Sequence, residues 1–252
     1  MGNRRIIARL AIVAALCLSG VPTLLADDSG LVVSVDAQHK FTKKFSADVD
    51  AEMRTRNNFR TWDRFSVGLG GSYKLNKWLK AGAGYQLIID NDKEKISYNL
   101  DGSFNNWRPS YWGVRHRAYV TLTASYRLGR FDISLRERGQ YTYRPEHETT
   151  RYDFDNQYWE NTTVRSKNKY MLRSRLKVEY DIPASKFTPW ASVELFNDLT
   201  LEKTRALVGV DYTFRKKHIF ELSYRYQHVH GGLDDDGETG MHMLGVGYTF
   251  KF

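Results

Sequence analysis

Residues 45–56 read FSADVDAEMRTR. Apolar residues hold the odd positions from Phe45 to Met53, and polar or charged residues hold the even positions. Because successive side chains of a β-strand point to opposite faces, this alternation predicts a strand with one dry face and one wet face. The stretch is also long enough to cross a bilayer, since a tilted strand needs about 9–11 residues.

The same alternation recurs along most of the chain. Ten such segments begin at Phe45, Phe65, Leu79, Ala118, Phe131, Leu172, Ala191, Ala206, Phe220 and Leu244. The fold class that we predict is all-β, an antiparallel transmembrane β-barrel of 10–12 strands. Strands of this length are unusual in a soluble β-sandwich, which is the alternative fold.

The number of strands depends on one further segment. Ten strands would leave both ends of the sheet on the same side of the membrane, as in even-numbered barrels. Leu31–His39 also alternates and is a candidate eleventh strand. Three arrangements are open for this segment. It packs inside the lumen, it adds at the barrel seam, or it has a partner strand in a long loop, for which the candidate is Thr149–Gln157.

Composition excludes several other classes. After the N-terminal region no apolar run is long enough for a membrane-spanning helix, so an α-helical membrane protein is excluded. Aromatic residues make up 14% of this polar chain, which suits a barrel with aromatic girdles. The net charge of +9 is spread along the chain without a basic run, so we expect no nucleic-acid partner.

Connections between the predicted strands are alternately short and long. Asn76–Trp78, Gly129-Arg130 and Arg215–Lys217 are tight turns, whereas Asp90–Gly113 and Arg144–Asn168 are long. Short periplasmic turns and long outer loops are typical of outer-membrane barrels. A two-residue turn at Gly129-Arg130 would pair Leu128 with Phe131 on the dry face.

The N-terminal residues predict export. A basic head with Arg4, Arg5 and Arg9 precedes an apolar stretch from Leu10 to Leu18, followed by small residues. This order is typical of a secretory signal peptide, so we predict a signal peptide at residues 1–26 and a barrel at residues 27–252. The expected location is the outer membrane of a Gram-negative cell, with outer-membrane lipid around the barrel.

The C-terminal strand ends in alternating aromatic residues. Gly247, Tyr248, Phe250 and the terminal Phe252 resemble the assembly signal of bacterial outer-membrane proteins. This resemblance implies that the barrel-assembly machinery is a partner.

The wet faces carry the candidate functional residues. Inward positions hold many arginines and a few carboxylates: Arg115, Arg117, Arg136, Arg138, Arg173, Arg175, Arg225, Asp50, Glu52 and Glu194. We expect the four arginines of the two strands that begin at Phe131 and Leu172 to stand at one height, with the carboxylate pair Asp50 and Glu52 across the lumen.

Two interpretations of these charges remain open. In the first, a water-filled lumen forms a small porin-like diffusion channel that favours anionic solutes. In the second, the charges form ion pairs that plug a narrow interior, since 10–12 strands lie between the filled and the open sizes of barrel. The inward glycines Gly68, Gly70, Gly82 and Gly84 favour space along one wall.

Several phrases of the sequence resemble an outer-membrane barrel family known as domain of unknown function 2490. They are Arg115-His116-Arg117-Ala118-Tyr119, Leu135-Arg136-Glu137-Arg138-Gly139-Gln140-Tyr141 and Tyr224-Arg225-Tyr226-Gln227. The resemblance covers nearly the whole chain after the signal and implies the fold and the location. In architecture, the inward arginines are also similar to those of small porins for acidic oligosaccharides.

Enzyme and metal sites are not expected. No His-x-Ser or Asp-x-His pair accompanies Asp90-Asn91-Asp92, so an outer-membrane hydrolase is the weaker alternative. We expect no cofactor and no metal, although His228, His230 and His242 lie near Asp234–Asp236. Glu137 falls on the dry face, which implies either a bulge or a covering protein.

Overall fold

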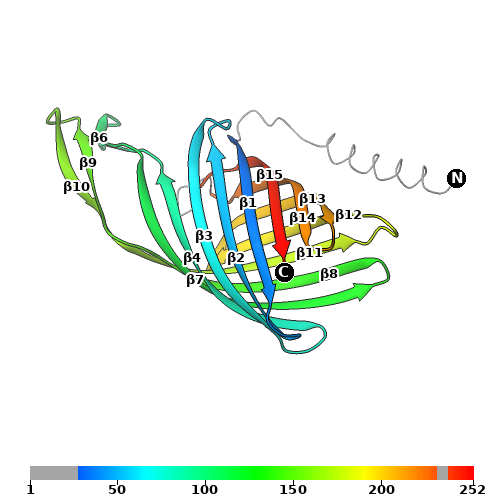
Figure 1. Cartoon of the computed structure of the whole chain (residues 1–252). Helices are drawn as coiled ribbons and strands as arrows, with labels where there is room; N and C mark the ends of the chain where they lie inside the picture. The colour runs from blue at the N-terminus through cyan, green and yellow to red at the C-terminus, as the bar shows by residue number, and fades with distance from the viewer. Residues whose placement is uncertain (1–27, 232–237) are drawn as a thin grey trace.

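The computed structural model describes residues 28–231 and 238–252. Its main body is a closed barrel of eleven strands (Figure 1). In chain order these are β1 (Asp28–Lys40), β2 (Phe45–Arg56), β3 (Thr61–Lys74), β4 (Leu79–Asp92), β7 (Tyr111–Leu128), β8 (Phe131–Arg144), β11 (Lys167–Tyr180), β12 (Phe187–Asp198), β13 (Thr200–Phe214), β14 (His218–Val229) and β15 (Met241–Lys251). The prediction of an all-β barrel with 10–12 strands is confirmed.

The barrel closes through a parallel pair of strands. β1 pairs with β15 in parallel, from Asp28 beside Met241 to Gln38 beside Lys251, whereas the other neighbouring pairs of the barrel are antiparallel. Leu31–His39 therefore adds at the seam, one of the three arrangements considered. With eleven strands in place of ten, the two ends of the sheet lie at opposite rims.

The barrel buries polar side chains and exposes apolar ones. Arg115 and Glu194 retain 2% of their accessible surface, whereas Val120 and Leu222 on outward positions retain 63% and 60%. This distribution is the reverse of that in a soluble protein, where large exposed apolar surfaces are rare. It follows directly from the period-two alternation, since each strand turns its charged set inward.

The two rims of the barrel differ. At the rim where β15 ends, neighbouring strands are joined by short turns, of which the tightest is Gly129-Arg130. Gly129 has a φ of +60°, which glycine adopts without strain. Leu128 lies opposite Phe131, as predicted. Aromatic pairs such as Phe131 with Tyr180, at 5.0 Å between ring centroids, form a belt at this rim.

The opposite rim carries a second sheet. β5 (Lys95–Tyr98) and β6 (Phe104–Arg108) lie between β4 and β7, and β9 (His147–Asp153) and β10 (Tyr158–Val164) lie between β8 and β11. They form a four-stranded sheet in the order β10-β9-β6-β5, which projects beyond the rim (upper left in Figure 1). The first part of Thr149–Gln157 lies in β9 and the rest forms the turn to β10, so its proposed role as a barrel partner of Leu31–His39 is wrong.

Two further expectations concern the membrane. Within residues 28–231 and 238–252, no helix is long and apolar enough to cross a bilayer. The predicted signal peptide, residues 1–26, lies outside the described residues.

Glu137 does point outward from β8, but without a bulge. Its strand pairs continuously with both neighbours, Leu122 on one side and Ser174 on the other. The Ser174 hydroxyl donates a 2.6 Å hydrogen bond to the Glu137 carboxylate. The regular register therefore excludes the bulge, and the serine supplies a donor on an otherwise apolar face.

Candidate functional site

The lumen contains a cavity of about 770 Å³. Charged and polar side chains line most of it, including all four arginines of the predicted cluster. The volume is within the range of roughly 300–1,000 Å³ that small-molecule sites occupy. The cavity is therefore large enough for a small solute.

The four arginines of β8 and β11 form one group, which we call the arginine cluster. Arg138 lies beside Arg173 across the two strands, and Arg136 lies beside Arg175. The equal heights that we expected for these four residues follow from this register. The alternation of each strand turns all four side chains inward, so four guanidinium groups share one section of the wall.

Glu194 on β12 is the carboxylate within the arginine cluster. Its side-chain oxygens lie 2.6 Å from Arg173 Nη2, 3.4 Å from Arg136 Nη2 and 3.9 Å from Arg175 Nε. Glu194 is almost fully buried. One negative charge thus faces three guanidinium groups, and the cluster keeps an excess of positive charge.

Arg138 is held by an aromatic ring instead. Its guanidinium carbon lies 4.2 Å from the ring centroid of Tyr119. A Cβ atom added to Gly84 would clash with the Tyr119 ring, and one added to Gly70 would lie 3.0 Å from its hydroxyl. The glycines on this wall therefore make room for Tyr119, which in turn supports the cationic face of the cluster.

The arginine cluster has hydrogen-bond donors without partners. The Nε–H groups of Arg136, Arg138, Arg173 and Arg175 are buried and lack an acceptor among the described residues. Buried polar groups are normally paired, so such donors require an explanation. An oxyanion in the cavity would supply acceptors of the right charge.

Asp50 and Glu52 lie on a different part of the wall. β2, which carries both residues, is five strands away from β11 in the barrel order, the largest separation in an eleven-stranded barrel. Glu52 accepts a 2.9 Å hydrogen bond from Arg54. The carboxylates of β2 therefore lie on the wall across the lumen from β11, as expected, whereas Glu194, the third predicted carboxylate, lies within the arginine cluster.

The remaining predicted arginines are dispersed. Arg115 binds Asp90 at 2.9 Å and Asp92 at 2.8 Å near the rim with the long connections, which we call the outer end. Arg117 donates to Thr142 at 3.0 Å. Arg225 and Arg117 both line the cavity.

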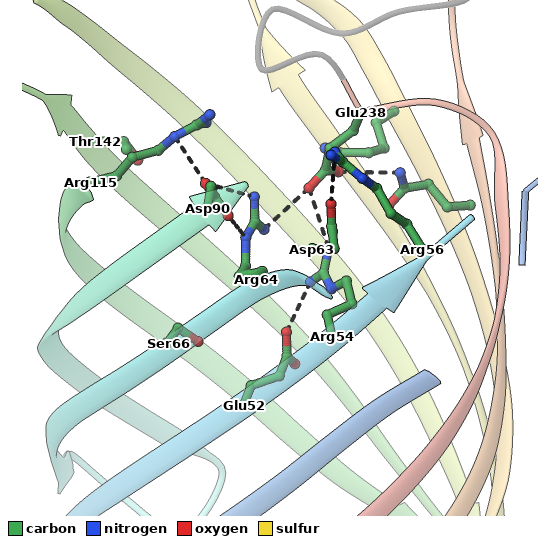
Figure 2. A network of polar contacts seen from close by, with 12 residues as sticks. Glu52, Arg54, Arg56, Asp63, Arg64, Ser66, Asp90, Arg115, Thr142 and Glu238 are labelled. Carbon is green, nitrogen blue, oxygen red and sulfur yellow. Dashed lines mark hydrogen bonds and ion pairs between the residues drawn. The ribbon is translucent and has the colours of Figure 1, made fainter. Parts of the chain in front are cut away.

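A network of ion pairs lies at the outer end of the lumen (Figure 2). Arg64 pairs with Asp90, which also forms an ion pair with Arg115. Arg54 joins this network through Glu52 and Glu238. Arg54, Arg64, Asp90, Arg115 and Glu238 line a small cavity of about 30 Å³, roughly the space of one water molecule.

Glu238 is the centre of this network. Oε2 lies 2.6 Å from Lys203 Nζ and 3.3 Å from Arg205 Nη2, and Oε1 lies 3.2 Å from Arg64 Nη1 and 3.3 Å from Arg54 Nη1. Burial raises the pKa of this loop carboxyl, but the positive charges of Lys203, Arg64, Arg205 and Arg54 outweigh burial and hold the pKa well below its usual value of 4.5. Glu238 is therefore ionised at neutral pH.

Sequence reasoning missed this network. Arg54, Arg64 and Arg205 are inward positions that the alternation would have identified if it had been followed to the outer end of each strand. Glu238 follows residues 232–237 and lies outside any strand, so no periodic signal marks it.

The predicted C-terminal residues and histidines lie outside the cavity lining. Gly247, Tyr248 and Phe250 lie in β15, and the Phe252 amide donates to the Gln38 carbonyl at 3.0 Å, next to the seam. Among the described residues, no three His, Cys, Asp or Glu side chains lie close enough to hold a metal ion. Asp234–Asp236, considered with the histidines, lie outside the described residues.

Comparisons with known proteins identify a family. No curated protein matches the sequence. Among solved structures, the beta domain of the Bordetella autotransporter Brka is similar, with 12% identity, a TM-score of 0.49, and coverage of 83% of this chain and 82% of that chain. The model of the family described as protein of unknown function (DUF2490) matches residues 31–237. The chain belongs to the DUF2490 family.

Proposed function

We propose that this chain is an integral outer-membrane β-barrel and forms a small channel that favours anionic solutes. The apolar outward faces contact outer-membrane lipid, and the long connections face the outside of the cell. The C-terminal residues Gly247, Tyr248, Phe250 and Phe252 are recognised by the barrel-assembly machinery.

The observation that carries the proposal is the arginine cluster. Four guanidinium groups share one section of a polar cavity, with Glu194 as their carboxylate and with four Nε–H donors lacking acceptors among the described residues. Arginine remains charged at any working pH and binds carboxylate or phosphate through paired hydrogen bonds. The cluster therefore attracts small oxyanions and repels cations.

A plugged structural barrel is the second candidate, favoured by the network at the outer end. In that case the ion pairs of Glu238 and Arg115 fill the lumen permanently, and the barrel supports only interactions at its rims. A hydrolase is less favoured, because Asp90 and Asp92 both bind Arg115.

The test uses the refolded full chain in planar bilayers under a KCl gradient. We expect the sign of the reversal potential to show that chloride permeates more readily than potassium. Replacing Arg138 and Arg173 together by Gln should lower the anion-to-cation permeability ratio severalfold. The matched control is Arg127→Gln, an exposed rim arginine that pairs with Asp181, and it should leave the ratio unchanged.

Two results would contradict the proposal. A wild-type channel that prefers cations would defeat the anion selectivity. A wild-type protein that neither conducts nor binds inorganic phosphate in calorimetry, although it is folded by its heat-modifiable gel mobility, would favour the plugged barrel.

A further inference from the structure

We infer that the Glu238 carboxylate occupies an oxyanion-binding site at the outer end of the lumen and that a carboxylate or phosphate group of the solute displaces it. This inference rests on the proposed function, because it concerns the path of the same solute. It assigns a second anion site, distinct from the arginine cluster.

The surroundings of Glu238 are those of a bound oxyanion. Oε1 faces Arg54 and Arg64, and Oε2 faces Lys203 and Arg205. The four cationic side chains are buried, with 5–10% of their surface exposed. We call these four residues the Glu238 cage.

A neutral donor completes the cage. Gln227 donates a 3.2 Å hydrogen bond to Oε2 of Glu238. Both oxygens are thus fully engaged, as they would be in a phosphate or carboxylate ligand. Cations of the cage also have other partners: Arg64 binds Asp90, Arg54 binds Glu52, and Arg205 donates a 2.7 Å hydrogen bond to Gln227.

The contacts of Glu238 join opposite walls of the barrel. Lys203 and Arg205 belong to β13, and Arg64 belongs to β3, five strands away in the barrel order. Figure 2 shows Glu238 above Arg54 and Arg64, linked to both by dashed lines. While the carboxylate stays in place, it closes the route between the cavity and the outer rim.

The arginine cluster and the Glu238 cage meet at one aromatic ring. The ring of Phe196 lies 4.9 Å from the guanidinium carbon of Arg173, 4.6 Å from that of Arg205 and 5.0 Å from Lys203 Nζ. Arg173 belongs to the cluster, and Arg205 and Lys203 belong to the cage. An anion that leaves the arginine cluster towards the outer end therefore reaches the cations of the Glu238 cage.

Displacement is a competition between two carboxylate-like groups. Glu238 is tethered, so its effective concentration at the cage is on the order of millimolar or higher. A monovalent ion such as chloride cannot match its two oxygens, whereas a dianion brings more charge and more acceptors. We therefore expect multivalent oxyanions at millimolar concentration to open the outer end more often, and chloride alone to leave the wild-type channel at a low but measurable open probability.

The experiment compares wild type, Glu238→Gln and a matched control in planar bilayers. The control is Glu202→Gln, which removes a carboxylate of β13 that pairs with Lys169 at 2.8 Å. At constant ionic strength, inorganic phosphate should raise the wild-type open probability at least threefold. Glu238→Gln should be open without phosphate, and Glu202→Gln should behave as the wild type does.

The outcomes separate this inference from the proposed function. If Glu238→Gln is as closed as the wild type, or if phosphate does not open the wild type, the displacement is refuted and anion selectivity can still stand. If Glu238→Gln opens but passes cations preferentially, the proposed function is refuted and the closure by Glu238 stands.

A second measurement tests the inference if a variant misfolds or if no variant conducts current. Glu238→Asp keeps the charge with a shorter side chain, and heat-modifiable mobility shows whether each variant is folded. In calorimetry, the folded Glu238→Gln protein should bind inorganic phosphate at least tenfold more tightly than wild type. Equal affinities would overturn the inference even if no variant conducts.

Discussion

Replacing Glu194 by Gln should destabilise the barrel and make its stability depend on anions. The substitution keeps the size of the side chain and removes the negative charge that faces Arg173 at 2.6 Å and Arg136 at 3.4 Å. The nearby guanidinium groups then repel one another without a neutralising charge. In the Glu194→Gln variant without a bound anion, the net charge of the arginine cluster rises by one.

The magnitude follows from the contact distances. At an effective dielectric constant of 20, a pair at 2.6 Å attracts by about 6 kcal/mol before desolvation is subtracted. Desolvation offsets part of this gain, and removing one partner of a buried pair typically costs about 3–5 kcal/mol. Because the cavity admits water, we expect a loss near the lower value in the free energy of unfolding.

Urea unfolding in detergent, with and without inorganic phosphate, measures this effect. A ligand that binds the folded state stabilises it by about 2.7 kcal/mol at a hundred times its dissociation constant. Phosphate should therefore restore most of the loss in Glu194→Gln and restore little in the control Glu179→Gln, whose carboxylate pairs with Lys177. A Glu194→Gln protein that is as stable as wild type, or that phosphate does not rescue, would refute the reasoning.

Three further predictions concern other contacts. Gly84→Ala should push the Tyr119 ring out of place and lower the anion preference in reversal-potential measurements; an unchanged preference would contradict the supporting role of the ring. Ser174→Ala should cost about 1–3 kcal/mol in urea unfolding, because Glu137 loses its donor on an apolar face. The pKa of Glu238 in the folded protein lies below 4.5, so its carboxylate should have its full closing effect on the outer end above pH 4.5. This effect should be lost only as the pH falls through the lowered pKa of the folded protein. Single-channel recordings should then show opening in acid well below pH 4.5, and opening between pH 5 and 7 would contradict this.

The period-two pattern was sufficient to predict the wall of the barrel. It identified the inward arginines of β8 and β11. Counting residues from the short turn at one end of each strand placed Arg138 level with Arg173, as the register shows. The pairing of Leu128 with Phe131 was predicted by the same reasoning. Glu194 lies directly opposite Arg175 on the neighbouring strand, so its place beside the arginine cluster follows from one register.

Other features depended on information that the pattern does not contain. The height of Asp50 and Glu52 relative to the cluster was less certain, because heights across several strands shift with the shear of the barrel. Glu238 reaches the lumen from a loop, where no alternation applies. The seam position of Leu31–His39 remained one of three arrangements, since alternation states that a strand forms but does not identify its neighbour.

The parallel pairing of β1 with β15 restricts how this chain can be re-engineered. Joining the two ends of the sheet, as circular permutation requires, is simple when they share a rim. Here Asp28 lies beside Met241 and Gln38 lies beside Lys251, so the two ends are a full strand length apart. A linker would have to pass through the lumen or run along the lipid face, where unpaired backbone is not tolerated. The permuted protein would need an added crossing of about ten residues, which would convert the barrel to an even number of strands.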